Sequence, residues 1–238
     1  MPADAAQATG EDEALLRAAQ LRRVYGEGED ASLALDGTSL TVREGELVAI
    51  EGRSGSGKTT LLNVVSGLDR TDEGTVHLLG DELGALSTDE RLALRADEVG
   101  FVFQKPALVP ELTLLENVAL GARIRGIEPA ASRDRASRAL ADVDLAGLED
   151  RFPGEVSGGE AQRASVARAF AKDPHLVLAD EPTANLDRET AELVADVFRA
   201  SIKDGQAAAL VVTHDPVVAE VASRTHRLQQ GRLHEGQA

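Results

Sequence analysis

The segment that most constrains the fold of this chain is Gly52-Arg-Ser-Gly-Ser-Gly-Lys-Thr59, a full match to the pattern G-x-x-x-x-G-K-[ST]. The apolar run Leu47–Ile50 before it is typical of a buried strand, and Thr59–Val65 after it is predicted to be helical. A strand, a glycine-rich loop and a helix in this order form the context of a phosphate-binding loop. The alternative is an ordinary glycine-rich turn with an exposed lysine, which that context disfavours. The motif therefore predicts an α/β fold that binds phosphate groups.

Each residue type in such a loop has a physical task. Glycines allow backbone N–H groups to face phosphate oxygens, Lys58 reaches the β- and γ-phosphates, and the Thr59 hydroxyl ligates Mg²⁺. The predicted nucleotide contacts in this loop are Gly52, Ser54, Gly55, Ser56, Gly57, Lys58, Thr59 and Thr60.

A second apolar run, Leu176–Ala179, is followed by two acids, Asp180 and Glu181. A carboxylate at the end of a buried strand beside a phosphate-binding loop can hold Mg²⁺, which predicts this role for Asp180. Glu181 points elsewhere and can orient or deprotonate an attacking water. In isolation the two acids are more simply read as solvating a strand end before the turn at Pro182. Next to the glycine-rich loop, the functional interpretation is favoured.

A third motif is Ser157-Gly-Gly-Glu160, which reads as the start of a helix. Ser157 can cap the helix while Glu160 reaches back, which makes a capping box. Two glycines just inside a helix cost roughly 1 kcal/mol each relative to alanine, so they suggest a ligand that approaches the backbone closely. A helix N-terminus with a serine hydroxyl and bare amides is an anion site. A capping box alone is the simpler reading, but two other phosphate motifs in the same chain argue against it.

The order and spacing of these three motifs resemble the nucleotide-binding subunit of ATP-binding cassette (ABC) transporters, over roughly residues 15–235. The run from Val156 to Glu160 stands where that family has its LSGGQ signature. The resemblance implies ATP and Mg²⁺ as cofactors. It also implies a P-loop NTPase fold of the α/β class, with a parallel-sheet core, an N-terminal antiparallel β part and a helical subdomain at about residues 105–165. The ABC ATPase domain would then comprise residues 15–238.

The resemblance also assigns roles to four isolated residues. Gln104 falls at the Q-loop glutamine, which contacts Mg²⁺ and water, and His214 falls at the switch histidine, which contacts the γ-phosphate. Tyr25 matches the aromatic residue that stacks on adenine, and Asp187 lies in the D-loop. Taken alone, Gln104 would be a plain loop residue, His214 a satisfied strand-end histidine and Tyr25 a surface aromatic. Their joint occurrence at the family spacing favours the functional readings for Gln104 and His214, while the motif around Tyr25 is short.

The predicted site therefore has three overlapping groups of residues. The catalytic residues are Glu181, His214 and Gln104, the metal ligands are Thr59, Gln104 and Asp180, and the nucleotide contacts outside the loop are Tyr25, Ser157, Gly158, Gly159, Glu160 and Asp187.

Two positions depart from the family signature. Val156 replaces the leading leucine and keeps an apolar anchor. Glu160 replaces the usual glutamine, keeps the capping acceptor and places a negative charge near a phosphate, so its side chain is expected to turn back toward Ser157. The glutamate at this position and the segment Asp180–Asp187 are similar to those of one branch of the family. That branch contains the lipoprotein-release, macrolide-export and cell-division ATPases.

The composition limits the partners of the chain. Its 238 residues carry a formal net charge of −16, which argues against nucleic acids and acidic lipid surfaces as direct partners. It contains no cysteine, so disulfides and thiolate metal sites are excluded. No apolar run approaches the roughly 18–20 residues of a membrane span, so we expect no direct membrane insertion. Residues 1–14 are expected to be a disordered acidic tail and not a signal peptide.

Because the chain has no membrane span, the resemblance implies a partner. We expect an ATP-hydrolysing subunit that powers a separate integral-membrane permease, as a head-to-tail homodimer, peripheral at the cytoplasmic face of the cell membrane. An ABC ATPase without a permease, for example of the cofactor-assembly type, is the alternative. A GTP-dependent switch would need an N-K-x-D motif after a strand, which the sequence lacks. The sequence of this chain does not specify the transported substrate, which permeases usually select, nor the direction of transport.

Hydrophobic patterns give a coarse map of the remaining elements. The predicted strands are Leu15–Val24, Ser32–Leu35, Ser39–Val42, Thr75–Leu79, Val99–Phe103 and Ala208–Val212, and helices are expected within 113–150 and at Arg188–Ile202. The apolar segment Lys105–Glu116 has two readings, ordinary core at a helix start or a groove for a permease helix that Leu108 and Leu112 would line.

Overall fold

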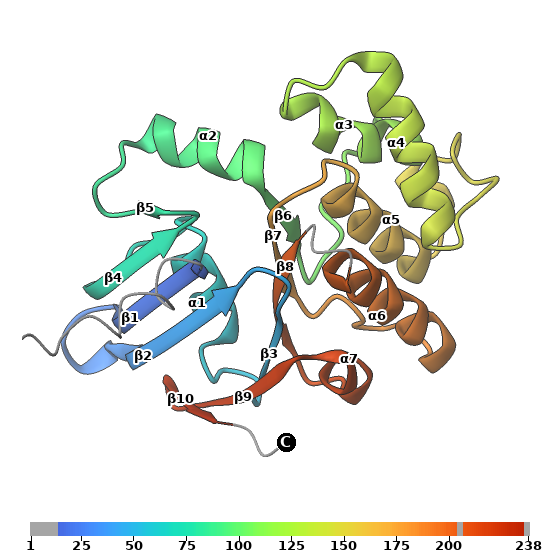
Figure 1. Cartoon of the computed structure of the whole chain (residues 1–238). Helices are drawn as coiled ribbons and strands as arrows, with labels where there is room; N and C mark the ends of the chain where they lie inside the picture. Colours follow the sequence, from blue (N-terminus) through green and yellow to red (C-terminus); the bar gives the residue numbers. More distant parts are fainter. Residues whose placement is uncertain (1–13, 204–206, 236–238) are drawn as a thin grey trace, which may run out of the picture.

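The computed structural model describes residues 14–203 and 207–235, and Figure 1 shows how its elements are arranged. The predicted tail lies outside these residues except for Ala14, which begins the first strand. Among the described residues, no helix combines the length and apolar character needed to cross a membrane.

A largely parallel sheet forms the core of the fold, in the strand order β10-β9-β3-β8-β7-β6. The four strands β3, β8, β7 and β6 pair in parallel with one another, β9 is parallel to β3, and β10 is antiparallel to β9. Their bounds are β3 Leu47–Glu51, β6 Val99–Val102, β7 Leu176–Asp180, β8 Ala208–Thr213, β9 Arg224–Gln229 and β10 Arg232–Glu235. The predicted parallel-sheet core is confirmed.

Both faces of this sheet are buried because side chains alternate along each strand. In β3, Val48 and Ile50 belong to one hydrophobic core. Strands β1 (Ala14–Tyr25) and β2 (Ser32–Arg43) and helix α1 (Lys58–Val65) also contribute to this core. Leu47 and Ala49 belong to a second core on the other face, which the helices that follow β6 in the chain cover. Leu47–Ile50 of β3 are therefore all apolar, as expected for a strand covered on both sides.

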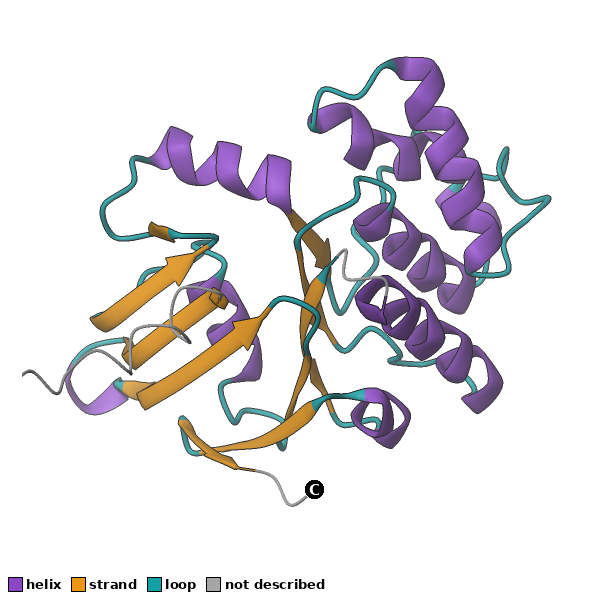
Figure 2. Ribbon diagram, in the orientation of Figure 1, coloured by secondary structure: helices purple, strands orange, loops and turns teal. Residues whose placement is uncertain are grey.

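The second sheet is antiparallel, in the order β2-β1-β4-β5, and lies on the left of Figure 2. It comprises β1 (Ala14–Tyr25), β2 (Ser32–Arg43), β4 (Glu73–Leu78) and β5 (Asp81–Glu82). The two strands predicted at residues 32–35 and 39–42 are wrong as separate elements, because they form one strand. Gly37, with a φ of 73°, lets the backbone pass through a bulge in place of the turn that its sequence suggests.

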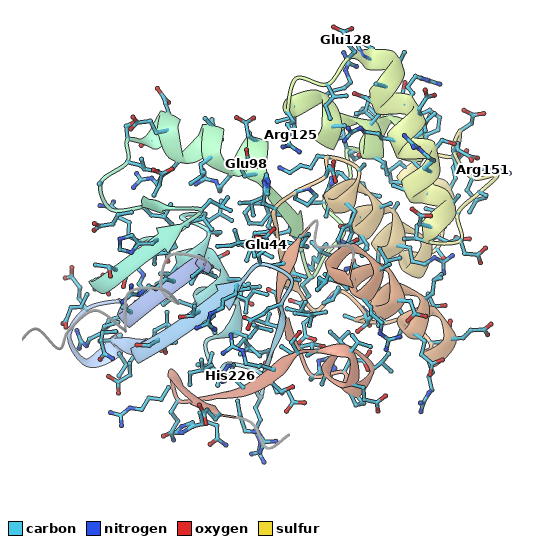
Figure 3. The ribbon with its side chains drawn as sticks, viewed as in Figure 1. Glu44, Glu98, Arg125, Glu128, Arg151 and His226 are labelled. Atoms are coloured by element: carbon cyan, nitrogen blue, oxygen red, sulfur yellow. The ribbon has the colours of Figure 1, made fainter. Side chains whose placement is uncertain are left out.

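The helices between the phosphate motifs form a group of their own, at the right of Figure 1. This group contains α3 (Leu114–Ile124), α4 (Pro129–Asp142) and α5 (Gly158–Phe170). Arg125, at the end of α3, donates to Lys172 O at 2.7 Å and lies 3.8 Å from Glu98 Oε2, so it ties this group to the core sheet (Figure 3). Glu98 ends α2, which spans Thr88–Glu98. The remaining helices are α6 (Arg188–Lys203) and α7 (Pro216–Val221).

The apolar segment after Gln104 is held by one buried side chain. The Asn117 amide accepts a hydrogen bond from Val109 N at 2.7 Å and donates to the carbonyls of Val109, Leu112 and Thr113 at 3.0 Å. Leu108 packs against the second core, the one that contains Leu47 and Ala49. The structure therefore favours the ordinary-core reading for Leu108, and we drop the groove hypothesis for that position.

Candidate active site

The phosphate-binding loop lines a cleft of about 680 Å³ that opens at the carboxyl ends of the parallel strands. Open α/β sheets bind ligands at this edge, because the loops that follow parallel strands meet there. The predicted residues that line the cleft are Tyr25, Gly52, Ser54, Gly55, Ser56, Gly57, Lys58, Thr59, Thr60, Gln104, Asp180, Glu181 and His214. The fold thus brings together residues from five separate stretches of the sequence.

Glycines in the loop are required by packing as well as by phosphate access. Gly57 has a φ of 102°, and a Cβ there would lie 2.3 Å from Ala34 O. A Cβ at Gly52 would lie 2.7 Å from Leu228 O. Gly57 also precedes α1 without any side-chain cap, so the first N–H groups of this helix remain available to an anion.

Lys58 begins α1 and bends back over the loop. Its Nζ donates to Gly52 O at 2.6 Å and lies 3.7 Å from Glu181 Oε1. Ser56, also in the loop, has a buried hydroxyl with no hydrogen-bond partner among the described residues. A phosphate oxygen over the loop would satisfy this hydroxyl and would neutralise the lysine charge.

Asp180 and Thr59 place two oxygen atoms side by side at the floor of the cleft. Thr59 Oγ1 donates to Asp180 Oδ2 at 2.8 Å. Burial raises the pKa of Asp180, and the nearby charge of Glu181 acts in the same direction, while the hydrogen bond from Thr59 opposes it. Such oxygen ligands suit Mg²⁺, which keeps several water molecules and binds through one or two protein groups plus substrate phosphates. No group of three His, Cys, Asp or Glu side chains that could hold a metal ion occurs in the described residues.

Glu181 is held in an unusual backbone conformation. Its φ is 50°, in the left-handed region that non-glycine residues rarely adopt, and its side chain is buried, with the residue only 7% exposed. Its Oε2 accepts from His214 N at 3.2 Å and lies 2.8 Å from His214 Nδ1. Its own N–H donates to Val212 O at 2.8 Å. Backbone strain of this kind costs on the order of 1–3 kcal/mol and is concentrated at functional sites.

Tyr25 stands at the rim of the cleft on a polar support that the sequence analysis missed. Its hydroxyl donates to Asp69 Oδ2 at 2.7 Å, and the Arg23 guanidinium lies 4.7 Å from the ring centre. Burial acts to raise the pKa of Asp69, but hydrogen bonds from Tyr25 and Arg23 outweigh it and hold that pKa below its usual value. No pattern in the sequence marks Asp69 or Arg23, since they are separated by 46 residues.

Ser157 and Glu160 form the predicted capping box at the start of α5. Ser157 Oγ accepts from Glu160 N at 3.2 Å, and Glu160 Oε2 accepts from Ser157 N at 2.7 Å. The side chain of Glu160 therefore turns back toward the cap, and these hydrogen bonds lower its pKa. A Cβ added at Gly158 would meet nothing within 4 Å, so packing in the protomer does not require glycine there.

The signature residues and Asp187 stand apart from the cleft of their own protomer. None of Ser157, Gly158, Gly159 and Glu160 lines it among the described residues. Asp187 caps α6 instead, because its carboxylate accepts from Thr190 N at 3.0 Å and from Thr190 Oγ1 at 2.9 Å. The cleft of one protomer therefore holds the predicted loop and strand-end residues but not the predicted signature residues or Asp187.

Comparison with known proteins identifies the family in which this arrangement of residues occurs. A family model described as ABC transporter matches residues 35–184. The chain belongs to the ABC transporter family. The lipoprotein-releasing system ATP-binding protein LolD of Pseudomonas syringae pv. tomato is 44% identical over 224 residues, covering 94% of this chain and 99% of that protein. The ABC transporter ATP-binding protein YbbA of Escherichia coli is 42% identical, covering 90% and 94%.

Solved structures agree with this membership. The ATP-binding cassette MJ0796, described as a dimer in a post-hydrolysis state bound to ADP and Pi, superimposes with a TM-score of 0.87 at 35% identity. The match covers 94% of this chain and 99% of that one. This chain is accordingly an ABC ATPase of the lipoprotein-release branch, and it binds and hydrolyses ATP. The non-ABC alternative, a GTP-dependent switch, is excluded by this membership.

Proposed function

We propose that two copies of this chain bind two ATP molecules head to tail and use their hydrolysis to power a separate integral-membrane permease. Each ATP lies between the loop Gly52–Thr60 of one copy and the signature Ser157–Glu160 of the other. The observation that carries this proposal is the bare Gly158 at the start of α5, where the protomer itself leaves open space. Residues 15–238 form one ATPase domain in this proposal, with a helical subdomain at about residues 105–165.

The loop and the strand ends supply the first half of each site. Lys58 leaves the Gly52 carbonyl for the β- and γ-phosphates, and Tyr25 stacks on the adenine. Thr59, Asp180 and Gln104 hold Mg²⁺, which neutralises charge on the phosphates when bound. The adjacency of Thr59 Oγ1 and Asp180 Oδ2, 2.8 Å apart, supports the first two ligands.

Glu181 and His214 act on the attacking water and the γ-phosphate. Glu181 orients the water and accepts its proton, and its left-handed backbone holds the carboxylate in the cleft. His214 donates from its backbone N to that carboxylate, so the position of the histidine and the position of the base are linked. Catalysis of phosphoryl transfer by such a site consists mainly of positioning and charge stabilisation.

Coupling to a permease is supported by the names of the relatives. LolD is described as the ATP-binding protein of a lipoprotein-releasing system, and YbbA as an ABC transporter ATP-binding protein. We propose that this chain likewise sits at the cytoplasmic face of the membrane through its permease. Expression together with a multi-span membrane protein encoded beside it should bring the chain into the membrane fraction. A chain that stays outside this fraction would favour an ABC ATPase without a permease.

Substitution of Glu181 tests the proposed chemistry. Glu181→Gln keeps the size of the side chain and one acceptor oxygen but cannot accept a proton, so turnover of MgATP should fall on the order of 10²–10³-fold. Affinity for ATP, measured by equilibrium binding, should stay within about threefold, a change below one tenfold step of 1.4 kcal/mol. Glu189→Gln, an exposed acid on α6, is the matched control and should keep full turnover. Equal turnover of the two variants would refute the role of Glu181.

A further inference from the structure

The loop that carries Gln104 is attached to the signature helix by two hydrogen bonds. Gln162 Nε2 donates to Phe103 O at 3.3 Å, and Arg168 Nη1 donates to Ala107 O. These two carbonyls flank Gln104, and both donors belong to α5, the helix that begins at the signature. We call residues 103–107 the Q-loop.

Both donors are committed to the Q-loop. Gln162 is only 2% exposed. Burial lowers the pKa of the Arg168 guanidinium, and within the described part of the chain no carboxylate forms an ion pair with it. Arg168 is half-buried, and desolvation of its charge has a cost unless the guanidinium finds a hydrogen-bond partner. Here a backbone carbonyl of the Q-loop is that partner.

The far end of α5 is packed too closely to shift independently of its neighbours. A Cβ at Gly100 of β6 would lie 2.8 Å from Ala169 O, and a Cβ at Gly121 of α3 would lie 2.8 Å from Arg168 O. Gln162 and Arg168 are six residues apart, so their attachment points are separated by about 9 Å along a rigid helix. A movement of α5 as a rigid body would therefore move both attachment points of the Q-loop.

We propose that Gln162 and Arg168 are positioning residues that link the two ATP sites of the dimer. This inference rests on the proposed function, in which Ser157 contacts the partner's ATP while Gln104 of the same chain contacts its own. ATP at the partner's site fixes the N-terminus of α5, and the two hydrogen bonds carry that position to Gln104. The sites thereby favour each other's closed state, and hydrolysis becomes cooperative in ATP.

The test measures hydrolysis by the full chain as a function of MgATP concentration. Gln162→Met keeps the volume and removes the donor, and Arg168→Met does the same at the other end. Parent protein should show a Hill coefficient above 1, up to the limit of 2 for two sites. Both variants should fall to 1, with kcat reduced about 10- to 100-fold, as expected when a catalytic group is misplaced by about 1 Å. Arg168→Lys retains a donor and should restore cooperativity in part.

Two further measurements separate the possible failures. In the Glu181→Gln background, MgATP should still drive both methionine variants into dimers, because the signature and the phosphate-binding loop are intact. Arg133→Met, at an exposed position of α4, is the control for loss of an arginine and should behave as the parent. If the parent itself forms no ATP-dependent dimer, the proposed function fails. If the parent dimerises and the methionine variants keep its Hill coefficient and kcat, the link through Gln162 and Arg168 is wrong.

Discussion

The start of α1 and the start of α5 are both suited to phosphate, yet they are built in opposite ways. Gly57 precedes α1 in a left-handed conformation and offers no side-chain cap. Ser157 precedes α5 and forms a complete capping box with Glu160. Uncapped N–H groups can donate hydrogen bonds to an external anion, whereas capped N–H groups already donate to a side chain of the helix. The start of α1 leaves its N–H groups free of side-chain caps, and the start of α5 satisfies part of its own.

Packing shows the same contrast. Gly57 lies against the backbone of β2 and Gly52 against that of β9. Packing within the protomer therefore requires glycine at both positions. Gly158 faces open space, so packing within the protomer gives no reason for glycine there. We infer that α1 provides a deep site within one chain, while α5 provides a shallow surface that completes a site on another copy.

The largest expected difference concerns assembly. In the Glu181→Gln background, Ser157→Arg should abolish MgATP-driven dimerisation by filling the phosphate position in the partner's site, while ATP affinity of the monomer stays within about threefold. Lys58→Ala should instead weaken ATP binding itself by roughly 10- to 100-fold, since hydrogen bonds to charged groups contribute about 1.5–3 kcal/mol. Light scattering gives the mass, and equilibrium binding gives the affinity. A Ser157→Arg protein that dimerises like its parent would remove α5 from the site.

Alanine at the two helix starts should change stability in opposite directions. Gly57→Ala places a Cβ 2.3 Å from Ala34 O on a backbone with a φ of 102°, so it should destabilise the fold by roughly 2–4 kcal/mol. Gly158→Ala meets no atom and adds helix propensity, so it should stabilise the monomer by roughly 0.5 kcal/mol. Denaturant unfolding measures both values.

The same pair also tests the reason for glycine at the second position. Gly158→Ala should weaken ATP-driven dimerisation by about tenfold, which corresponds to 1.4 kcal/mol, because the added methyl group lies where the partner's nucleotide approaches. A variant that is more stable and dimerises as tightly as its parent would contradict a ligand-based reason for Gly158.

Features marked by neighbouring residues were predicted from the sequence, and features that depend on distant contacts were not. Local motifs located the cleft, because the P-loop pattern and the acids after Leu176–Ala179 are read from neighbouring residues. Helix α2 was missed, although Ser87 and Glu90 form a capping box, because Leu92 is exposed and no apolar stripe marks the helix. Strand β9 was missed because it is largely polar, with only Leu228 buried.

Long-range contacts to the backbone leave no trace in a single sequence. Gln162 and Arg168 donate to carbonyls 59 and 61 residues away, and a carbonyl acceptor is present at every residue. The single strand β2 was divided in two because Gly37 reads as a turn, while only the pairing with β1 shows that the strand continues. Sequence therefore predicts which groups line the cleft better than it predicts what holds those groups in place.

The smallest expected effect concerns the charge on the cap of α5. Glu160→Gln keeps an acceptor for Ser157 N but removes the negative charge from the first turn, so it should destabilise the monomer by roughly 0.3–1 kcal/mol near neutral pH. Hydrogen bonds from Ser157 lower the pKa of Glu160, so the folded state favours the carboxylate. Its contribution is complete above the ordinary pKa of a glutamate and is lost as pH falls through the lowered value.

The difference in unfolding free energy between parent and Glu160→Gln should therefore shrink toward zero in acid, as denaturant titrations across pH can measure.

The same substitution should strengthen ATP-driven dimerisation, although it weakens the monomer. At neutral pH the variant lacks a negative charge beside the partner's γ-phosphate, so ATP-driven dimers in the Glu181→Gln background should form about two- to threefold more tightly, which is a fraction of 1.4 kcal/mol. A stability difference that persists unchanged in acid would show that the charge of Glu160 plays no part in the cap. Weaker dimers would show that the partner's site uses that charge.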